Sequence, residues 1–288
     1  MSQYPKVSVC MITYGHEKYI RQAIEGVLMQ QCDFEVEFIV ANDCSPDATG
    51  QVIKDIIKSH PRGSWIKYMR HDKNLGMMPN FIFAIQECKG EYIALCEGDD
   101  YWTDPFKLQK QVDFLENNSK YSYCGHKSFV LENEIFTPVA RETKEITLAV
   151  LLNKNGLNTA TLVFRKSSIG IFPSFFKDIA AGDWFLQLMA IKNGDGFVLD
   201  DFMSVYRVHS GGIWSALSDK EMCKLGVDTL NQARFLFKDK KTNLLINKSI
   251  SDRLRSNNLI PESFGIKFEK RIKKYIKLFC RTFFMNTL

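Results

Sequence analysis

Three carboxylates fall within four residues at Glu97, Asp99 and Asp100, directly after the apolar run 92–96. Like charges this close repel one another unless a cation lies among them. Hard divalent ions such as Mg²⁺ and Mn²⁺ commonly bind one or two carboxylates while substrate phosphates complete their coordination. A metal here could neutralise the charge that grows on a departing diphosphate. The alternative is a solvated acidic turn preceding a helix that opens at Thr103, whose N-terminus favours negative charge.

The elements that would position these carboxylates are short strands separated by helices. Mostly apolar segments at 7–12, 36–41 and 92–96 and a weaker one at 65–70 predict four strands, and the intervening segments carry apolar residues at helical spacing. This alternation predicts an α/β fold with a mostly parallel, doubly wound sheet that is covered by helices on both faces.

Polar side chains follow each predicted strand. The first three strands are followed by Thr13, Tyr14, Gly15 and His16, by Asn42 and Asp43, and by His71, Asp72, Asn74 and Gly76. Ligands of open parallel sheets bind beyond the carboxyl ends of the strands. The acidic turn after the fourth strand therefore lies where a site is expected, although any α/β enzyme would share part of this pattern.

The second half of the chain is less regular. Its predicted elements are a helix from 103, strands at 121–124, 127–131 and 159–164, and a helix starting near Asp183. A length of 288 residues allows one large α/β domain with a smaller appendage. We therefore expect a catalytic domain over residues 1–215 and a helical extension over 216–288.

The net charge of +5 is concentrated at the C-terminus, where residues 266–288 carry seven Lys or Arg and one Glu, so residues 1–265 sum to −1. This near-neutral body argues against a nucleic-acid partner. The basic residues of the tail lie largely opposite a set of apolar residues. These apolar residues recur at steps of three and four: Phe268, Ile272, Ile276, Phe279 and Phe283. Such a helix suits peripheral contact with the anionic inner face of a membrane, and docking on the protein's own body is the alternative.

The chain lacks the pattern of a signal peptide and any uncharged apolar stretch of about 18 residues. Its eight cysteines form no CxxC pair and fall mostly within apolar runs, which is typical of reduced thiols. A cytoplasmic location is expected, with peripheral contact at the inner membrane face through residues 266–288.

Four segments together resemble one known family. They follow one another over about the first 116 residues and read VSVCMITYGHEKYIRQAIEGVLMQQ, FEVEFIVANDCSPDATGQVI, NLGMMPNFIFAI and YIALCEGDDYWTDPFKLQKQVDFLE. In this order they resemble family 2 glycosyltransferases with the GT-A fold. The resemblance implies transfer of a sugar, with inversion, from a nucleotide-diphosphate donor (a UDP-sugar above all) to a glycan or lipid-linked acceptor. It also implies Mn²⁺ or Mg²⁺ as cofactor and, by analogy, a setting in bacterial polysaccharide biosynthesis.

The resemblance assigns roles in nucleotide binding. Tyr14 matches a residue that lies against the base, and Asp43 matches a carboxylate that accepts a hydrogen bond from the base. Simple packing of Tyr14 and an Asx-type turn at Asp43 are the alternatives. Asn74 lies in a turn that would run alongside the nucleotide, which a plain turn also explains. Asn42 replaces the first of the family's paired acids, which removes one charge.

Roles within the acidic turn follow from the same resemblance. Asp99 matches the second acidic position of the DxD-type motif and is the first choice of metal ligand. Asp100 matches a further ligand or a group that positions the ribose or the sugar. Glu97 stands where many members carry Asp, and its side chain would reach one methylene farther toward the ribose or the metal.

Asp183 resembles the family's catalytic base, which a helix start supplies after the acidic motif. Such a base takes the proton of the acceptor hydroxyl. The helix N-terminus is expected to keep Asp183 ionised, and an N-cap role is the alternative. His209 could ligate the metal or be an ordinary histidine, and Arg207 could pair with phosphate. Trp102 and Trp184 could form a stacking floor for an acceptor sugar or belong to the core.

Two rival enzyme classes would need a glycine-rich loop after the first strand. A nucleotidyltransferase would carry a Gly-rich, basic phosphate loop after the first strand, and a dinucleotide oxidoreductase would carry G-x-G-x-x-G there. The chain instead reads Thr13-Tyr14-Gly15-His16-Glu17. A degenerate transferase that only binds its ligands remains an alternative, because sequence letters do not prove activity.

Overall fold

The computed structural model describes residues 4–140, 143–214, 216–257 and 259. A central sheet runs through them in the order β3-β2-β1-β4-β9-β6-β10-β5, with β7 paired to β6 and β8 to β10. The strands are β1 (Val7–Thr13), β2 (Val36–Asn42), β3 (Ile66–Arg70), β4 (Tyr92–Leu95), β5 (Tyr101–Trp102), β6 (Tyr121–Glu132), β7 (Ile135–Val139), β8 (Glu145–Ile146), β9 (Val163–Arg165) and β10 (Asp195–Arg207).

The α-helices and 3-10 turns lie between these strands and after them. The α-helices are α1 (Ile20–Leu28), α2 (Thr49–Ser59), α3 (Met77–Glu87), α4 (Lys107–Asn117), α5 (Leu148–Asn153), α6 (Lys166–Ile169), α7 (Gly182–Ala190), α8 (Asp219–Ala233) and α9 (Lys240–Ser256). Short 3-10 turns lie at Gly63–Trp65, Thr159–Thr161, Ser174–Asp178 and Ile191–Asn193.

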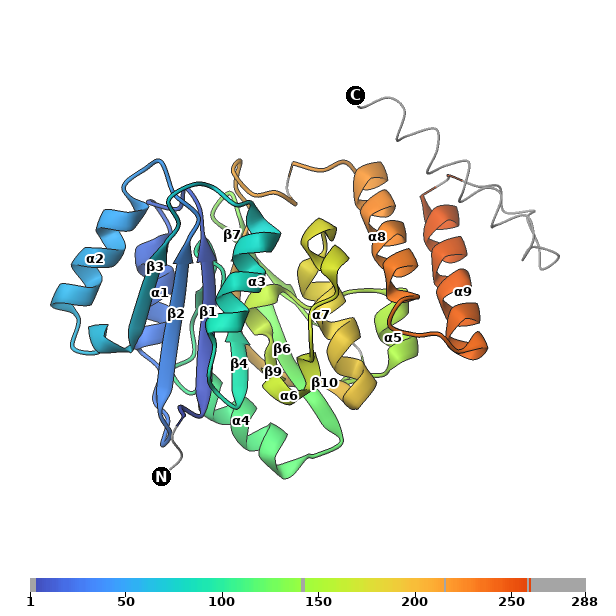
Figure 1. The fold of residues 1–288 in the computed structure, drawn as a ribbon, viewed down its shortest axis with the longest axis horizontal. Helices are drawn as coiled ribbons and strands as arrows, with labels where there is room; N and C mark the ends of the chain where they lie inside the picture. Colours follow the sequence, from blue (N-terminus) through green and yellow to red (C-terminus); the bar gives the residue numbers. More distant parts are fainter. Residues whose placement is uncertain (1–3, 141–142, 215, 258, 260–288) are drawn as a thin grey trace.

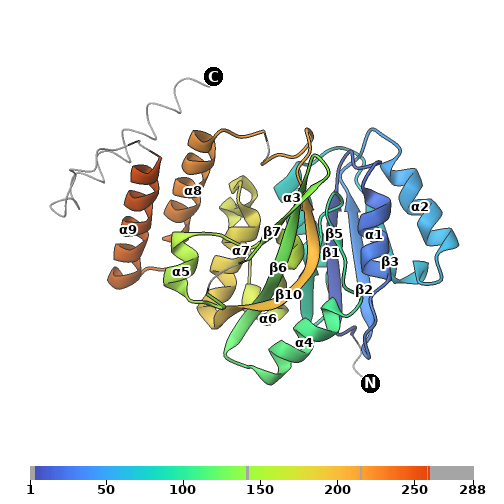
Figure 2. The same cartoon turned by 180° about the vertical axis from the view of Figure 1, so that it is seen from behind.

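The N-terminal half of the sheet is parallel. β1 pairs with β2 and β4 in a register that places Val7 beside Val36 and Tyr92, and β2 pairs with β3. Every residue of β2 is buried, and all but Glu37 and Asn42 are apolar, because helices cover both faces of the sheet. Figure 1 shows α3 in front of this half, and Figure 2, from behind, shows α1 on the opposite face.

Beyond β4 the sheet becomes mixed. β9 pairs antiparallel with both β4 and β6, β6 pairs parallel with the long strand β10, and β5 closes the edge antiparallel to β10. The predicted α/β class and the flanking helices are confirmed. The parallel pairs are β3 with β2, β2 with β1, β1 with β4, and β6 with β10.

Three predicted element boundaries in the second half differ from the structure. The strands expected at 121–124 and 127–131 form one strand, β6, because it pairs with β10 along its length through register shifts. The strand expected from 159 begins as a 3-10 turn. The helix expected to open at 103 starts only at Lys107, because Asp104 Oδ1 accepts the backbone N–H of Phe106 (2.7 Å) in a turn before it.

Helices α8 and α9 pack on the body of the protein at the side of α7 (Figure 1). Ser218 and Glu221 form a capping box that begins α8, and Asp239 caps α9 by accepting from the Thr242 amide (2.8 Å). Val227, Leu230, Ile246 and Ile250 are fully or almost fully buried in the same core as α3 and α7. The division at residue 215 stays a prediction, and the basic tail, 266–288, lies outside the described residues.

Within the described part of the chain, no helix is both long and apolar enough to cross a bilayer. The cysteines described there are all free thiols: Cys10, Cys32, Cys44, Cys88, Cys96, Cys124 and Cys223.

Candidate active site

Loops that follow β1, β2 and β4 meet at the carboxyl edge of the parallel half of the sheet. The amide of Asp43 donates to the carbonyl of Thr13 (2.9 Å), and the amide of Gly15 donates to Ser45 Oγ (3.0 Å). The acidic turn packs against the first loop so closely that a Cβ at Gly98 would lie 2.6 Å from Thr13 Oγ1. The fold therefore brings the polar residues predicted at these strand ends to one edge.

The Asp43 carboxylate holds the turn that precedes α3. It is 2% exposed, and its oxygens accept the backbone N–H groups of Leu75 (2.7 Å) and Gly76 (2.9 Å). Asn74 Oδ1 also accepts from Gly76 (2.9 Å), whose φ of 92° suits glycine. Asp43 and Asn74 thus shape one turn. Tyr14 is 48% exposed at the same edge, and its contact with a base stays a prediction.

Asp99 is held between two histidines. Its Oδ2 lies 3.2 Å from His209 Nε2 and 3.6 Å from His16 Nε2. Burial alone would raise the pKa of Asp99, but the hydrogen bond to His209 and the charge of His16 outweigh it and lower that pKa. Burial lowers the pKa of His16, although the nearby Asp99 carboxylate raises it. The two residues predicted as metal ligands, Asp99 and His209, are therefore neighbours.

Asp100 is the last residue of the acidic turn and is 1% exposed. Its Oδ1 accepts the backbone N–H of Arg207 (2.9 Å), and its Oδ2 is buried with no hydrogen-bond partner among the described residues. Burial, followed by the charges of Asp99 and Glu97, raises the pKa of Asp100 well above its usual range. The Arg207 guanidinium donates to the Asp99 carbonyl and to the Gln22 side chain. Arg207 thus supports the acidic turn, and its contact with phosphate stays a prediction.

Glu97 lines an adjoining pocket together with Asp183. Burial and the charges of Asp99 and Asp183 raise the pKa of Glu97 to about 8, although a hydrogen bond with Thr159 lowers it. The acidic turn thus contains carboxylates that repel one another, and one of them, Asp100, has an oxygen without a partner among the described residues. Together with the imidazoles of His16 and His209, these carboxylates form a donor set that suits Mn²⁺ or Mg²⁺. No group of three or more His, Cys, Asp or Glu in the described ranges could hold a metal alone, so a metal here would also need substrate oxygens.

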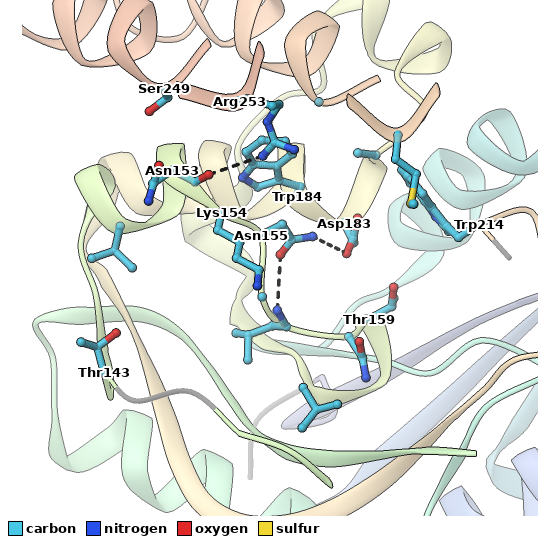
Figure 3. Close-up of a pocket in the computed structure, with 18 of the residues that line it drawn as sticks. Thr143, Asn153, Lys154, Asn155, Thr159, Asp183, Trp184, Trp214, Ser249 and Arg253 are labelled. Carbon is cyan, nitrogen blue, oxygen red and sulfur yellow. Dashed lines mark hydrogen bonds between the residues drawn. The ribbon is translucent and has the colours of Figure 1, made fainter. Parts of the chain in front are cut away.

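Asp183 stands in the first turn of α7, on the wall of this pocket of about 1120 Å³. Its Oδ2 accepts from Asn155 Nδ2 (2.9 Å; Figure 3), and Asn155 Oδ1 accepts from Gln187 Nε2 (3.1 Å). Ala181 is the N-cap residue, so Asp183 does not have that role. Burial raises the pKa of Asp183, although the hydrogen bonds from Asn155 and from the backbone at the helix start lower it, and that the helix N-terminus keeps the carboxylate ionised stays a prediction.

The two tryptophans considered as a stacking floor occupy different environments. Trp102 is 2% exposed and donates Nε1–H to the Ala160 carbonyl (2.9 Å), so it belongs to the core. Trp184 donates to the Leu151 carbonyl (2.9 Å) and lines the pocket. Trp214, which the sequence did not single out, lines the pocket as well.

Sequence reasoning also left other residues of this region without a role. His16 had been noted after the first strand, and its place three residues beyond Thr13 is the signal that could have assigned it to the edge. Asn155 contacts Asp183 from 28 residues away, and no local pattern announces that contact. The pocket wall formed by α8 and α9 was missed entirely, and it includes Met222, Gly226, Leu245, Lys248 and Arg253.

The mixed α/β sheet flanked by helices, with the acidic turn directly after β4, has the GT-A fold. The model of the family described as glycosyl transferase family 2 matches residues 8–176, and the chain belongs to that family.

Two curated proteins match about three quarters of this chain. The chain is 35% identical over 224 residues to an uncharacterised protein of Mycobacterium tuberculosis, which is 74% of this chain but only 62% of the relative's length. It is 26% identical over 223 residues to the UDP-Glc:alpha-D-GlcNAc-diphosphoundecaprenol beta-1,3-glucosyltransferase WfaP of Escherichia coli, which covers 76% of this chain and 83% of that protein.

Solved structures share the fold. S. aureus TarS 1–349 in complex with UDP-GlcNAc has a TM-score of 0.65 at 18% identity, over 94% of this chain and 77% of that one. The mannosyltransferase PcManGT of Pyrobaculum calidifontis, in complex with GDP-Man and Mn²⁺, has a TM-score of 0.61 at 14% identity, over 96% and 81%.

Proposed function

We propose that this protein transfers a sugar from a UDP-sugar, with inversion and with the help of Mn²⁺ or Mg²⁺, to a glycan or lipid-linked acceptor. The observation that carries the proposal is the Asp99 carboxylate between His209 and His16, on the same turn as Glu97, which lines the Asp183 pocket. WfaP, named as using UDP-Glc, and TarS, solved with UDP-GlcNAc, support the choice of nucleotide.

The donor would bind across the carboxyl edge of the sheet. Tyr14 would lie against the base. Asp43 would accept a hydrogen bond from the base with the lone pairs that its bonds to Leu75 and Gly76 do not use. Asn74 belongs to the same turn. Asp99 and His209 would hold the metal, with Glu97 and Asp100 as further carboxylates toward the metal, ribose or sugar.

A divalent ion bound at Asp99 would neutralise the charge that develops on the leaving diphosphate. The donor set fits Mn²⁺ well, because imidazole is a better ligand for Mn²⁺ than for Mg²⁺. The complex of PcManGT with Mn²⁺ supports this choice.

Asp183 would act as the general base. Its carboxylate would take the proton of the acceptor hydroxyl while that oxygen forms a bond to the anomeric carbon and the bond to the diphosphate breaks. Attack on the face opposite the leaving group inverts the anomeric centre. The hydrogen bond from Asn155 fixes the carboxylate, and the raised pKa makes it a stronger base than an exposed aspartate.

The test of this proposal is release of the nucleoside diphosphate. UDP- and GDP-sugars would each be incubated with the full-length protein in Mn²⁺ or in EDTA. We expect metal-dependent release of UDP that Asp183→Asn abolishes. Metal-dependent binding without any release, in folded protein and with varied acceptors, would support a degenerate transferase that only binds ligands.

We also propose a cytoplasmic enzyme in peripheral contact with the inner membrane face through the basic pattern of residues 266–288. Deleting these residues should reduce sedimentation with anionic vesicles and leave the melting temperature unchanged. Equal sedimentation of the truncated and full-length proteins would contradict membrane contact.

A further inference from the structure

One stripe of helix α9 faces the Asp183 pocket. The lining residues on this helix recur at steps of three and four, as one helical face does: Leu245, Lys248, Ser249, Asp252 and Arg253. Lys154, from the loop after α5, lines the same pocket. This wall therefore carries three cationic side chains, at Lys154, Lys248 and Arg253, whereas the proposed catalytic side carries the carboxylates Glu97 and Asp183.

Arg253 is built into this wall. Its guanidinium carbon lies 5.1 Å from the centre of the Trp184 ring, and its Nη2 donates to the Asn153 carbonyl (3.4 Å; Figure 3). A Cβ at Gly226 of α8 would lie 2.7 Å from Arg253 Nη1, so a glycine there leaves room for the guanidinium. Arg253 Nε is buried with no hydrogen-bond partner among the described residues. A guanidinium fixed in this way on the pocket wall is suited to bind an oxyanion.

The charge of this wall remains positive after its acidic residue is counted. Asp252 lines the pocket, and its Oδ1 lies 3.5 Å from Arg255 Nη1. The positive charge of Arg255 offsets the negative charge of Asp252. Lys248 and Lys154 are exposed. Three cations against one paired carboxylate match a phosphate or diphosphate better than a single carboxylate. An anion in this pocket is also repelled by Glu97 and Asp183, so it would lie at the α9 end.

We propose that the α9 wall is a subsite for a phosphate or diphosphate group on the acceptor sugar. Arg253, Lys248 and Lys154 bind the phosphate oxygens, and the sugar extends from them toward Asp183 with the hydroxyl that is glycosylated. This inference rests on the proposed function, because it presumes an acceptor, and it adds the chemical class that the acceptor must have. The sugar phosphate could be soluble or lipid-linked, since both present the same anion.

Binding can be measured apart from catalysis. Saturation-transfer NMR titrations of the full-length protein in EDTA would compare a hexose 1-phosphate, a short-chain alkyl diphosphate of the same hexose, a hexuronate and a methyl hexoside. EDTA removes metal-dependent binding at the donor site. The variants are Lys248→Gln, at an exposed position, and Arg253→Lys, which keeps the charge but loses the fork. Lys240→Gln, exposed on α9 but outside the pocket lining, is the control.

We expect the hexose 1-phosphate to bind at least about tenfold tighter than the methyl hexoside, and each pocket variant to remove most of this difference. Lys240→Gln should bind as the wild type does. Tighter binding of the alkyl diphosphate would support a lipid-linked source, and equal binding a soluble one. Stronger binding of the hexuronate, equal binding of all sugars, or unchanged affinity in both variants would overturn the subsite. Failure of UDP to bind with Mn²⁺ would instead overturn the proposed function, and the titrations in EDTA would still decide the phosphate site.

Discussion

His209 Nε2 lies 3.2 Å from Asp99 Oδ2, although 110 residues separate the two in the chain. The contact joins the loop after β10 to the acidic turn after β4, because β10 also binds that turn through the backbone of Arg207. A carboxylate and an imidazole so placed are the protein's share of the metal site proposed above.

Asp99→Asn should weaken metal-dependent UDP binding. Removing even a supporting partner of a ligand typically costs about 10–100-fold in metal affinity, so loss of the ligand itself should cost at least as much. Calorimetry with and without Mn²⁺ measures this loss. Asp113→Asn, on the exposed face of α4, is the control. An affinity of Asp99→Asn near that of wild type would rule out Asp99 as a ligand.

Asp183→Asn should reduce transfer by roughly 10²–10⁴-fold while leaving donor affinity unchanged, because the base acts on the acceptor hydroxyl. Asparagine can still accept from Asn155, so the pocket should keep its shape. Initial rates and UDP affinity measured on the same preparation check both parts. Undiminished turnover would mean that another group accepts the proton.

The same variant should change how stability depends on pH. Burial raises the pKa of Asp183 in the folded state, so the stability that its protonated form contributes is present below the unfolded pKa of about 4 and is lost as pH rises through the folded pKa. Asp183→Asn should therefore melt at or above the wild-type temperature at pH 7.5, and this advantage should vanish near pH 4. A lower melting temperature at pH 7.5 would contradict the raised pKa.

Asp43→Ala should destabilise the protein even without nucleotide. The two backbone N–H groups that Asp43 binds, at Leu75 and Gly76, would lose a charged acceptor, at a cost of about 2 kcal/mol or more in the free energy of unfolding. Urea denaturation measures this cost, and Asp72→Ala, at an exposed position in the same region, should have little effect. Equal stability of the two variants would show that the turn does not depend on Asp43.

Lys107 gives a second prediction for stability against pH. It is fully buried, its Nζ donates to Gln111 Oε1 (2.7 Å), and burial lowers its pKa to about 7. Because the unfolded pKa is about 10.4, folding releases a proton between these values, and stability falls as pH drops from about 10 to about 7. Lys107→Met lacks this dependence, so wild type should gain stability relative to it as pH rises from 7 to 10. Parallel curves from urea denaturation would contradict the lowered pKa.

Much of the site could be predicted from the sequence because its parts are local. The runs that became β1, β2 and β4 are apolar since both faces of the sheet are covered, and residues that follow parallel strands must share one edge. Tyr14, Asp43 and the turn from Glu97 to Asp100 were placed there by this argument alone.

The remaining features depend on contacts that no local pattern encodes. The binding of the 74–76 turn by Asp43 and the support of Asp99 by Arg207 arise only when distant segments meet. The raised pKa of Asp183 likewise results from burial in the folded protein. The contact of Arg253 on α9 with the Trp184 ring also forms only when the two helices pack together. Such contacts are set by packing, which periodicity does not report.

Calorimetric binding of UDP, GDP, CDP and ADP to the 288-residue protein, each with and without Mn²⁺, tests whether a nucleotide-sugar site lies at Asp99. We expect UDP to bind selectively and its binding to require the metal. Failure of every diphosphate to bind in the presence of Mn²⁺, in protein shown to be folded, would contradict a nucleotide-sugar site at Asp99.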